Sequence, residues 1–308
     1  MMPAALHARM QRLGLLRAAP AEANGSAPRR CSDVEELPGA EITTPHGVCW
    51  LREWRVDMKH GAGWSRQQIA EPQLPPVPAM RIECEAPEAL RSVLHRRPPR
   101  AGTRVAFDTE TTGLHSGAGV HVFLMGLASW EGGAVVLQQF LMRSPTEEAA
   151  MLYAVREELQ RHTGMLSFCG RGFDVPRTRD RLVLSGFKRQ LPVFPHDDLA
   201  PVARRFLKGR YSDCRLKTLE SQFLGFQRVD DLPGAECPRE WFALQRGQAH
   251  RMAAVLHHNA LDLLSLFALE HALLRELAQP TTPEAELAAA ICWREAGEFP
   301  SAHQRMRV

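Results

Sequence analysis

The stretch Arg104-Val105-Ala106-Phe107-Asp108-Thr109-Glu110-Thr111-Thr112-Gly113-Leu114 decides the fold. A short apolar run ends in two carboxylates, Asp108 and Glu110, and a Thr-Thr-Gly turn follows. Residues two apart on an extended strand point to the same face, so the two side chains should project side by side. Neighbouring carboxylates repel each other unless a cation lies between them, and hard oxygen ligands suit Mg²⁺ or Mn²⁺ rather than zinc. The stretch predicts a strand that ends at a divalent metal site; an unrelated acidic pair on a solvated strand end is the alternative.

Two downstream segments carry further acids in comparable places. Phe168-Cys169-Gly170-Arg171-Gly172-Phe173-Asp174 follows an apolar strand and places Asp174 at the opening of a helix. Asp262 lies in a long apolar-periodic helix, on the stripe that also carries His258 and should point inward. A buried aspartate is costly unless it is paired or coordinates a cation. The four carboxylates of Asp108, Glu110, Asp174 and Asp262 would balance two divalent cations.

These motifs resemble those of the DEDD superfamily of 3′–5′ exonucleases, which share the ribonuclease H-like fold. Asp108 to Leu114 is similar to the first motif, the segment ending in Asp174 to the second, and the helix around Asp262 to the third. One departure is Cys169, which stands where the second motif commonly carries Asn. Since Asp174 is the implied metal ligand, this departure concerns the geometry of the turn rather than catalysis.

A closer resemblance is to the bacterial YprB-type ribonuclease H-like family. It covers residues 100–278 well and residues 40–60 loosely. The segments that carry it are Pro45-His46-Gly47, Ala203-Arg204-Arg205, Cys214-Arg215-Leu216-Lys217-Thr218-Leu219-Glu220, Pro233-Gly234 and His258-Asn259.

The two resemblances imply a metal-dependent 3′–5′ exonuclease that hydrolyses phosphodiester bonds of DNA or RNA by a two-metal-ion mechanism. Asp108, Glu110, Asp174 and Asp262 are the implied ligands of two divalent cations, Mg²⁺ or Mn²⁺. Two other functions stay open. One is a non-catalytic nucleic-acid-binding or scaffold module on the same fold, and the other is a metal-dependent phosphodiesterase of small nucleotides.

Two histidines compete for the role of general base. His257 stands five residues before Asp262, the spacing of the DEDDh exonucleases, and His258 stands four before it, where DEDDy enzymes carry tyrosine. Within a continuous helix a separation of four residues puts two side chains on one face. The apolar pattern before His257 indicates that the helix has already begun, which favours His258. A helix that begins only at Asn259 would favour His257.

The order of the remaining elements predicts an α/β domain of ribonuclease H-like type. Strands are expected at 103–108, 120–130, 134–142, 164–168 and 192–198, in a mixed five-stranded sheet whose first three strands are antiparallel, flanked by helices. The capping box at Ser144 to Glu147 predicts a helix that runs to about His162.

We expect three parts in the chain. Residues 1–100 should form an N-terminal extension that is loose over 1–38, carries a small β element at 42–56 and ends in a proline-rich linker at 72–78. Residues 101–279 should form the exonuclease domain. Residues 280–308 should form a helical hairpin, either an ordinary one or one that resembles the opening of a tetratricopeptide unit and offers a protein partner a surface.

A basic run between the acidic motifs is the candidate substrate contact. Cations neutralise phosphates, and aromatic side chains stack on unpaired bases; a solvated basic loop is the alternative. The residues concerned are Arg204, Arg205, Lys208, Arg210, Arg215 and Lys217.

The composition is that of an ordinary globular protein. The chain has 308 residues, a net charge of +3, 44% hydrophobic and 24% charged residues. No apolar run approaches the length of a membrane span, so we expect no membrane association. Its N-terminus lacks the apolar core of a secretory signal. Seven scattered cysteines without a Cys-x-x-Cys pair argue against a disulfide framework and a zinc site, and suit a reducing cytoplasm.

Overall fold

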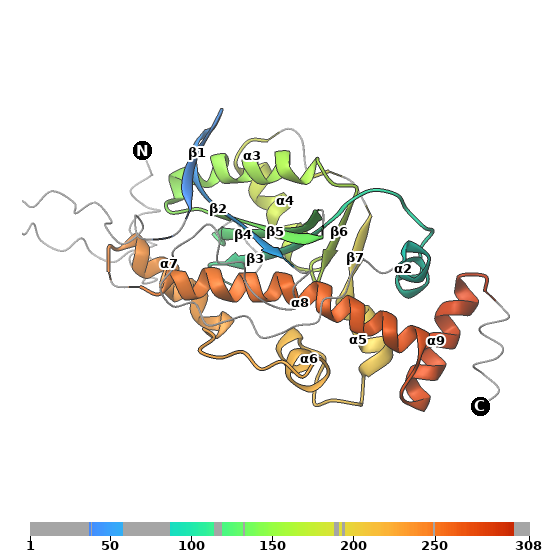
Figure 1. Cartoon of the computed structure of the whole chain (residues 1–308). Helices are drawn as coiled ribbons and strands as arrows, with labels where there is room; N and C mark the ends of the chain where they lie inside the picture. The colour runs from blue at the N-terminus through green and yellow to red at the C-terminus, as the bar shows by residue number, and fades with distance from the viewer. Residues whose placement is uncertain are drawn as a thin grey trace, which may run out of the picture.

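The computed structural model describes residues 37, 39–57, 87–113, 119–131, 133–187, 191–192, 195–248 and 250–298. The loose segment expected over 1–38 falls almost entirely outside these ranges. The proline-rich linker at 72–78 and the second helix of the C-terminal hairpin also lie outside them. The described part of the chain is an α/β fold in which helices cover both faces of one mixed sheet (Figure 1).

The sheet has the strand order β1-β2-β5-β4-β3-β6-β7. Its strands are β1 (Ala40–Thr44), β2 (Gly47–Asp57), β3 (Arg104–Thr111), β4 (Val122–Glu131), β5 (Ala134–Leu141), β6 (Gly164–Ser167) and β7 (His196–Asp198). Strands β3, β4 and β5 are antiparallel, whereas β6 and β7 run parallel to β3. The predicted class and the predicted strand directions are confirmed.

The sheet has seven strands instead of the expected five, because the hairpin formed by β1 and β2 joins it. Strand β2 pairs antiparallel with β5, with Trp50 opposite Leu141. Cys49 and Trp50 are buried in the core of the sheet. The alternating pattern at 42–56 indicates strands, but it contains nothing that identifies the strand with which they pair. The limits of the three parts, at residues 100 and 279, stay predictions.

The helices form two layers. They are α2 (Glu88–His95), α3 (Glu148–Leu159), α4 (Asp174–Leu184), α5 (Leu199–Leu207), α6 (Leu216–Gln222), α7 (Cys237–Gln245), α8 (Met252–Ala278) and α9 (Pro283–Glu295). Helix α3 lies on one face of the sheet and α8 runs along the other (Figure 1). The capping box at Ser144 opens the short 3₁₀ turn η2 (Pro145–Glu147), and α3 begins only after it. A second 3₁₀ turn, η3 (Gly234–Glu236), leads into α7.

Helix α8 is the principal core helix. It is 27 residues long and meets the length and composition of a membrane span, which the sequence analysis did not anticipate. Of the apolar window that meets this test, 78% is buried inside the protein. Its leucines pack against the sheet and against α5 and α9, so the apolar composition serves the core.

A buried ionic network fixes α8 to the start of β3. Arg104 donates two hydrogen bonds of 2.7 Å to Glu270 on α8 and one of 3.0 Å to Asp197 on β7. Arg97 donates two more to Asp197, at 2.7 and 2.8 Å. Despite burial, the charge of Arg104 holds the pKa of Glu270 well below its usual range. Asp197 is buried, although the sequence gives it no partner nearby, because these two arginines make its burial favourable.

Candidate metal centre

Strand β3 and helix α8 bring three of the four predicted ligands together. One carboxylate oxygen from each of Asp108, Glu110 and Asp262 lies within 4.8 Å of the other two. Asp108 and Glu110 project from the same face of β3, as their spacing predicts. Oxygen ligands of Mg²⁺ lie about 2.0–2.1 Å from the ion, so two of them on opposite sides of it are about 4 Å apart. The three oxygens therefore fit a hard divalent cation after small side-chain movements.

Asp174 reaches the same end of β3 from α4. It is the first residue of that helix and accepts a hydrogen bond of 2.5 Å from Thr109, which lies between the two strand carboxylates. Gly170 permits this approach, because a Cβ at that position would lie 2.5 Å from the hydroxyl of Ser167 and 3.4 Å from Asp174. The charge of Asp174 contributes to the raised pKa of Asp108, so the two carboxylates interact. Asp174 thus lies beside the group of three.

The turn before Asp174 is held by Asp198 and is strained at Cys169. Asp198 caps α5 through the N–H of Ala200 and also accepts from the N–H groups of Cys169 and Arg171. Cys169 has a φ of 64°, the left-handed conformation that Asn tolerates better than other non-glycine residues. This explains why Asn is common at that position in the resembling motif.

A buried amide pair orients Asp108, and sequence reasoning did not find it. Asn259 on α8 donates to Asp108 at 2.8 Å and in turn accepts from Gln139 on β5 at 2.7 Å. Both amide residues are fully buried. Gly126 pairs with Asp108 across β3 and β4 and leaves room for Asn259. The signal in the sequence was a polar residue next to His258 in an apolar helix, on a face different from that of Asp262.

Of the two candidate histidines, His258 faces the carboxylates. Helix α8 begins at Met252, before both of them, so the separation of four residues places His258 above Asp262. Its Nε2 lies 3.5 Å from Asp262 Oδ2, and its Nδ1 lies 2.7 Å from Asp231 Oδ1. His257 is buried in the core instead, where burial lowers its pKa to about 4.

Arg228 forms a second buried network behind Asp262. It donates to both carboxylate oxygens of Glu220, at 2.6 and 2.7 Å, and to Asp262. Arg228 also lies 3.6 Å from Asp231, the partner of His258. The side chains of Arg228 and Glu220 are 2% and 1% exposed, so the ion pair is fully buried. Glu220 ends one of the segments that carry the family resemblance, and here it acts by holding Arg228.

Burial and mutual repulsion raise the pKa values of the clustered acids. Burial and then the charges of Asp262 and Asp174 raise the pKa of Asp108 well above its ordinary value. Burial raises the pKa of Glu110 to about 8 and that of Asp174 to about 6. Burial alone would lower the pKa of His258, but the hydrogen bond that its ring donates to Asp231 and the charge of Asp262 raise it to about 9. The cluster is short of positive charge, which divalent cations would supply.

The six predicted substrate-binding residues divide into two groups. Arg205 donates to the carbonyl of Leu94, and Arg210 pairs with Glu276 at 2.7 Å, so both have partners within the protein. Arg210 is nevertheless exposed, as are the remaining four: Arg204, Lys208, Arg215 and Lys217. Two of the four lie close to the metal centre. Arg204 contacts Cys169 of the turn that carries Asp174, and Lys217 lies 3.3 Å from Asp231.

Comparison with known proteins identifies the family of this fold and site. The chain belongs to the RNase_H superfamily, whose family model matches residues 105–274. That range contains all the candidate ligands and His258. Membership supports nucleic-acid-processing nuclease chemistry at the level of the superfamily, and nucleases of this superfamily use divalent metals.

The chain is also similar to the uncharacterized protein YprB of Bacillus subtilis, which is 37% identical over 165 residues. The similar part covers 53% of this chain and 40% of YprB, so the chain matches less than half of its relative. This similarity agrees with the YprB-type resemblance of the motifs. Among solved structures, the family B DNA polymerase of the archaeon Pyrobaculum calidifontis aligns over 65% of this chain and 30% of its own, with 13% identity and a TM-score of 0.44.

Proposed function

We propose that this protein is a divalent-metal-dependent 3′–5′ exonuclease that hydrolyses phosphodiester bonds of DNA or RNA. The observation that carries the proposal is the group of Asp108, Glu110 and Asp262 oxygens, which lie within 4.8 Å of one another with Asp174 beside them. The direction of digestion follows from the resemblance to the DEDD motifs. The raised pKa values of Asp108, Glu110 and Asp174 support a metal-binding role for these carboxylates, because strongly perturbed pKa values are typical of functional sites.

In this proposal the carboxylates hold the metal ions and His258 moves a proton. Asp108, Glu110 and Asp262 would hold one ion, Asp108 would also reach a second, and Asp174 would act on that ion directly or through water. When bound, two such ions activate a water and stabilise the charge that develops on the phosphate and on the leaving oxygen. Cations held by Asp262 and Glu110 would offset the carboxylate charges that raise the pKa of His258. The neutral ring would then accept the proton of the attacking water at Nε2, while Asp231 holds Nδ1.

The proposed substrate is a polymer, because exposed cations flank the metal centre. Arg204 lies at the turn before Asp174, and Lys217 lies beside the residue that orients His258. Lys208 and Arg215 are exposed in the same segment of the chain. Cations in such positions neutralise backbone phosphates on either side of a scissile bond.

The experiment is digestion of 5′-labelled single- and double-stranded DNA and RNA with Mg²⁺, Mn²⁺ or EDTA. Hydrolysis from the 3′ end gives a ladder of shortened labelled products, and a blocked 3′ end should prevent it. EDTA should abolish the reaction. Tight binding without digestion under every metal condition would instead support the non-catalytic module, and digestion of dinucleotides alone would support the small-nucleotide phosphodiesterase.

Matched variants test the residues. Asp174→Ala should abolish digestion, whereas Asp180→Ala, an exposed aspartate on the same helix, should leave it unchanged. His258→Ala should reduce turnover about a hundredfold or more, as is usual for a general base. His257→Ala should retain turnover if the protein stays folded. The opposite result for the two histidines would transfer the proposed base to His257.

A further inference from the structure

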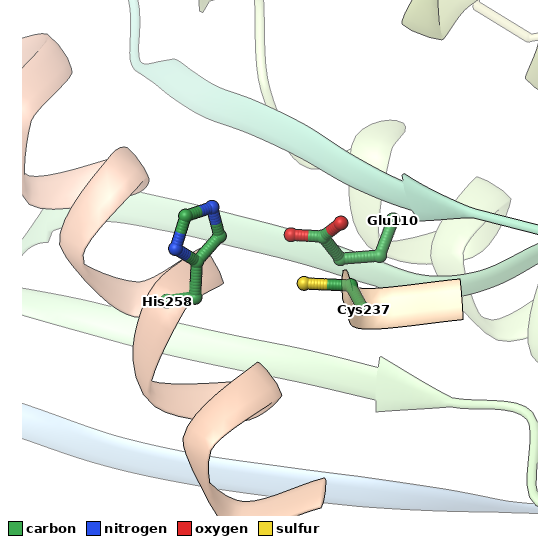
Figure 2. A group of neighbouring side chains, drawn as sticks. All are labelled: Glu110, Cys237 and His258. Carbon is green, nitrogen blue, oxygen red and sulfur yellow. The ribbon is translucent and has the colours of Figure 1, made fainter. Parts of the chain in front are cut away.

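A thiol lies against the metal centre. Cys237 is the first residue of α7 and is fully buried. Figure 2 shows its sulfur directed toward the carboxylate of Glu110 and the imidazole of His258, three side chains that come from β3, α7 and α8. One ligand atom of each residue lies within 4.8 Å of the other two. A thiol, an imidazole and a carboxylate therefore converge on one point.

This set of atoms differs in chemistry from the carboxylate group beside it. Mg²⁺ takes oxygen ligands, whereas Zn²⁺ is bound by thiolate sulfur, imidazole nitrogen and carboxylate oxygen. Zinc–ligand bonds of about 2.0–2.3 Å in a tetrahedron separate the ligands from one another by roughly 3.3–3.8 Å. The three atoms need to close by about 1.5 Å at most to reach that geometry. Cys237, Glu110 and His258 thus match zinc in both kind and spacing.

His258 is already oriented as a zinc ligand. Its Nδ1 is held by Asp231 at 2.7 Å, which leaves Nε2 for a metal. Asp231 is itself fixed by Arg228 at 3.6 Å and Lys217 at 3.3 Å. A carboxylate that holds the far nitrogen of a metal-bound histidine sets the tautomer and orientation of the ring, and this arrangement is common at zinc sites.

A second cluster in the described residues is a useful contrast, because its carboxylates are already neutralised by the protein. His95, Asp197 and Glu270 lie equally close together. There, Arg104 bonds to both carboxylates and Arg97 to one of them, so arginines already neutralise the acids. At Cys237 the neighbours that converge on the sulfur are instead a carboxylate and an imidazole, since one ligand atom of Glu110 and one of His258 lie within 4.8 Å of it.

We propose that Glu110, Cys237 and His258 form a binding site for a thiophilic divalent cation, Zn²⁺ by its ligand set. The site exists independently of any nuclease activity. It shares Glu110 and His258 with the proposed catalytic centre, so zinc would withdraw both from hydrolysis. That consequence alone rests on the proposed function.

The experiment uses Co²⁺ as a spectroscopic substitute for zinc in the full chain, stripped of metal with a chelator and kept reduced with a non-thiol reductant. Titration should produce the near-ultraviolet charge-transfer band of a cobalt thiolate, together with intense visible bands of tetrahedral cobalt. The bands should saturate at one bound ion per chain and disappear when one equivalent of Zn²⁺ is added. A wild-type protein that binds Co²⁺ without the thiolate band would overturn the proposal.

The matched variants are Cys237→Ala and Cys292→Ala, since Cys292 is an equally buried cysteine on α9. Cys237→Ala should lose the thiolate band and Cys292→Ala should keep it, with the fold of both checked by far-ultraviolet circular dichroism. A band that survives in Cys237→Ala would overturn the site. If Cys237→Ala fails to fold, His258→Gln should still weaken zinc binding at least tenfold, and unchanged zinc affinity in that variant would overturn the site. These cobalt and zinc binding measurements do not depend on nuclease activity, so they test the zinc site even if the nuclease assay shows no digestion.

Discussion

The surroundings of the carboxyl groups at the end of β3 favour their protonated, uncharged form. Asp108, Glu110 and Asp174 all have raised pKa values because they are buried and because neighbouring carboxylates repel one another. A raised pKa in the folded state stabilises the protein below the pKa of the unfolded chain, and that stabilisation is lost as the pH rises through the folded value. For Asp174 and Glu110 this window ends at about 6 and about 8.

The first prediction concerns metal-free stability. In EDTA, Asp108→Asn should gain thermal stability relative to wild type as the pH rises from 5 to 8, because the amide keeps its bond to Asn259 and carries no charge. Each kcal/mol of relieved repulsion raises Tm by roughly 2–4 °C in a protein of this size. Thermal melts at both pH values measure the difference, with Asp180→Asn as a control that should stay flat. Excess Mn²⁺ should then favour wild type, and a pH-independent difference would contradict the electrostatic account.

The second prediction concerns the left-handed Cys169. Cys169→Asn should stabilise the protein by about 0.5–1 kcal/mol, because Asn adopts this conformation more readily than cysteine. Chemical denaturation measures the free energy of unfolding. Cys214→Asn is the matched control, a half-buried cysteine without a positive φ, and should give no gain. Equal effects in the two variants would mean that strain at Cys169 is negligible.

At the scale of elements, the candidate metal centre depends on how closely α8 approaches the sheet. Gly126 on β4 lies opposite Asp108 and under Asn259. A Cβ there would come within 2.3 Å of the Asn259 side-chain oxygen and 2.7 Å of a Leu263 methyl group. The glycine therefore sets the distance between strand and helix, and through Asn259 it sets the position of Asp108.

The third prediction follows from this contact. Gly126→Ala should destabilise the protein by about 1–3 kcal/mol, the usual effect of overpacking, and should reduce metal-dependent hydrolysis as well. Gly119→Ala is the control, because a Cβ at Gly119 meets nothing within 4 Å and should change stability by less than about 0.5 kcal/mol. A Gly126→Ala protein with wild-type stability and hydrolysis would show that α8 shifts freely.

The individual elements also show which features of the structure could be predicted from the sequence. The pattern around Asp108, Asp174 and His258 predicted the face of each side chain, because periodicity within one element determines direction. It could not predict that β2 pairs with β5 or that Arg228 reaches Asp262, because pairing across the chain leaves no local pattern. The sequence likewise did not indicate Cys237 as a candidate ligand, because it belongs to no Cys-x-x-Cys pair and its neighbours come from two other elements.

At the scale of the whole molecule, net charge says little about a nucleic-acid partner, but the placement of charge says more. The chain as a whole carries only +3. Arg205 and Arg210 bond to groups far along the chain, which engages them within the fold. Four further cations of the basic segment are exposed, and of these Lys217 also pairs with Asp231: Arg204, Lys208, Arg215 and Lys217.

The fourth prediction is that replacing these four residues by alanine weakens binding of single-stranded nucleic acid and flattens its salt dependence. Each lost phosphate contact should reduce the slope of log K against log salt concentration by about 0.7, because fewer counterions are released. Binding titrations at several salt concentrations, with Ca²⁺ replacing the catalytic ion, measure the slope. Alanine at four exposed arginines elsewhere, Arg55, Arg161, Arg246 and Arg294, removes the same charge and should leave the slope unchanged.

Helix α8 and strand β3 are joined at two points, and the two spacings agree. The helix contributes Asp262 to the candidate metal centre and Glu270 to the bond with Arg104, eight residues or roughly 12 Å later. The strand covers roughly 13 Å between Arg104 and Asp108. The spacing along the helix therefore matches the spacing along the strand. A residue inserted between Asp262 and Glu270 would rotate and shift one of these side chains away from its partner on β3, whereas an insertion after Ala278 would leave both contacts in place.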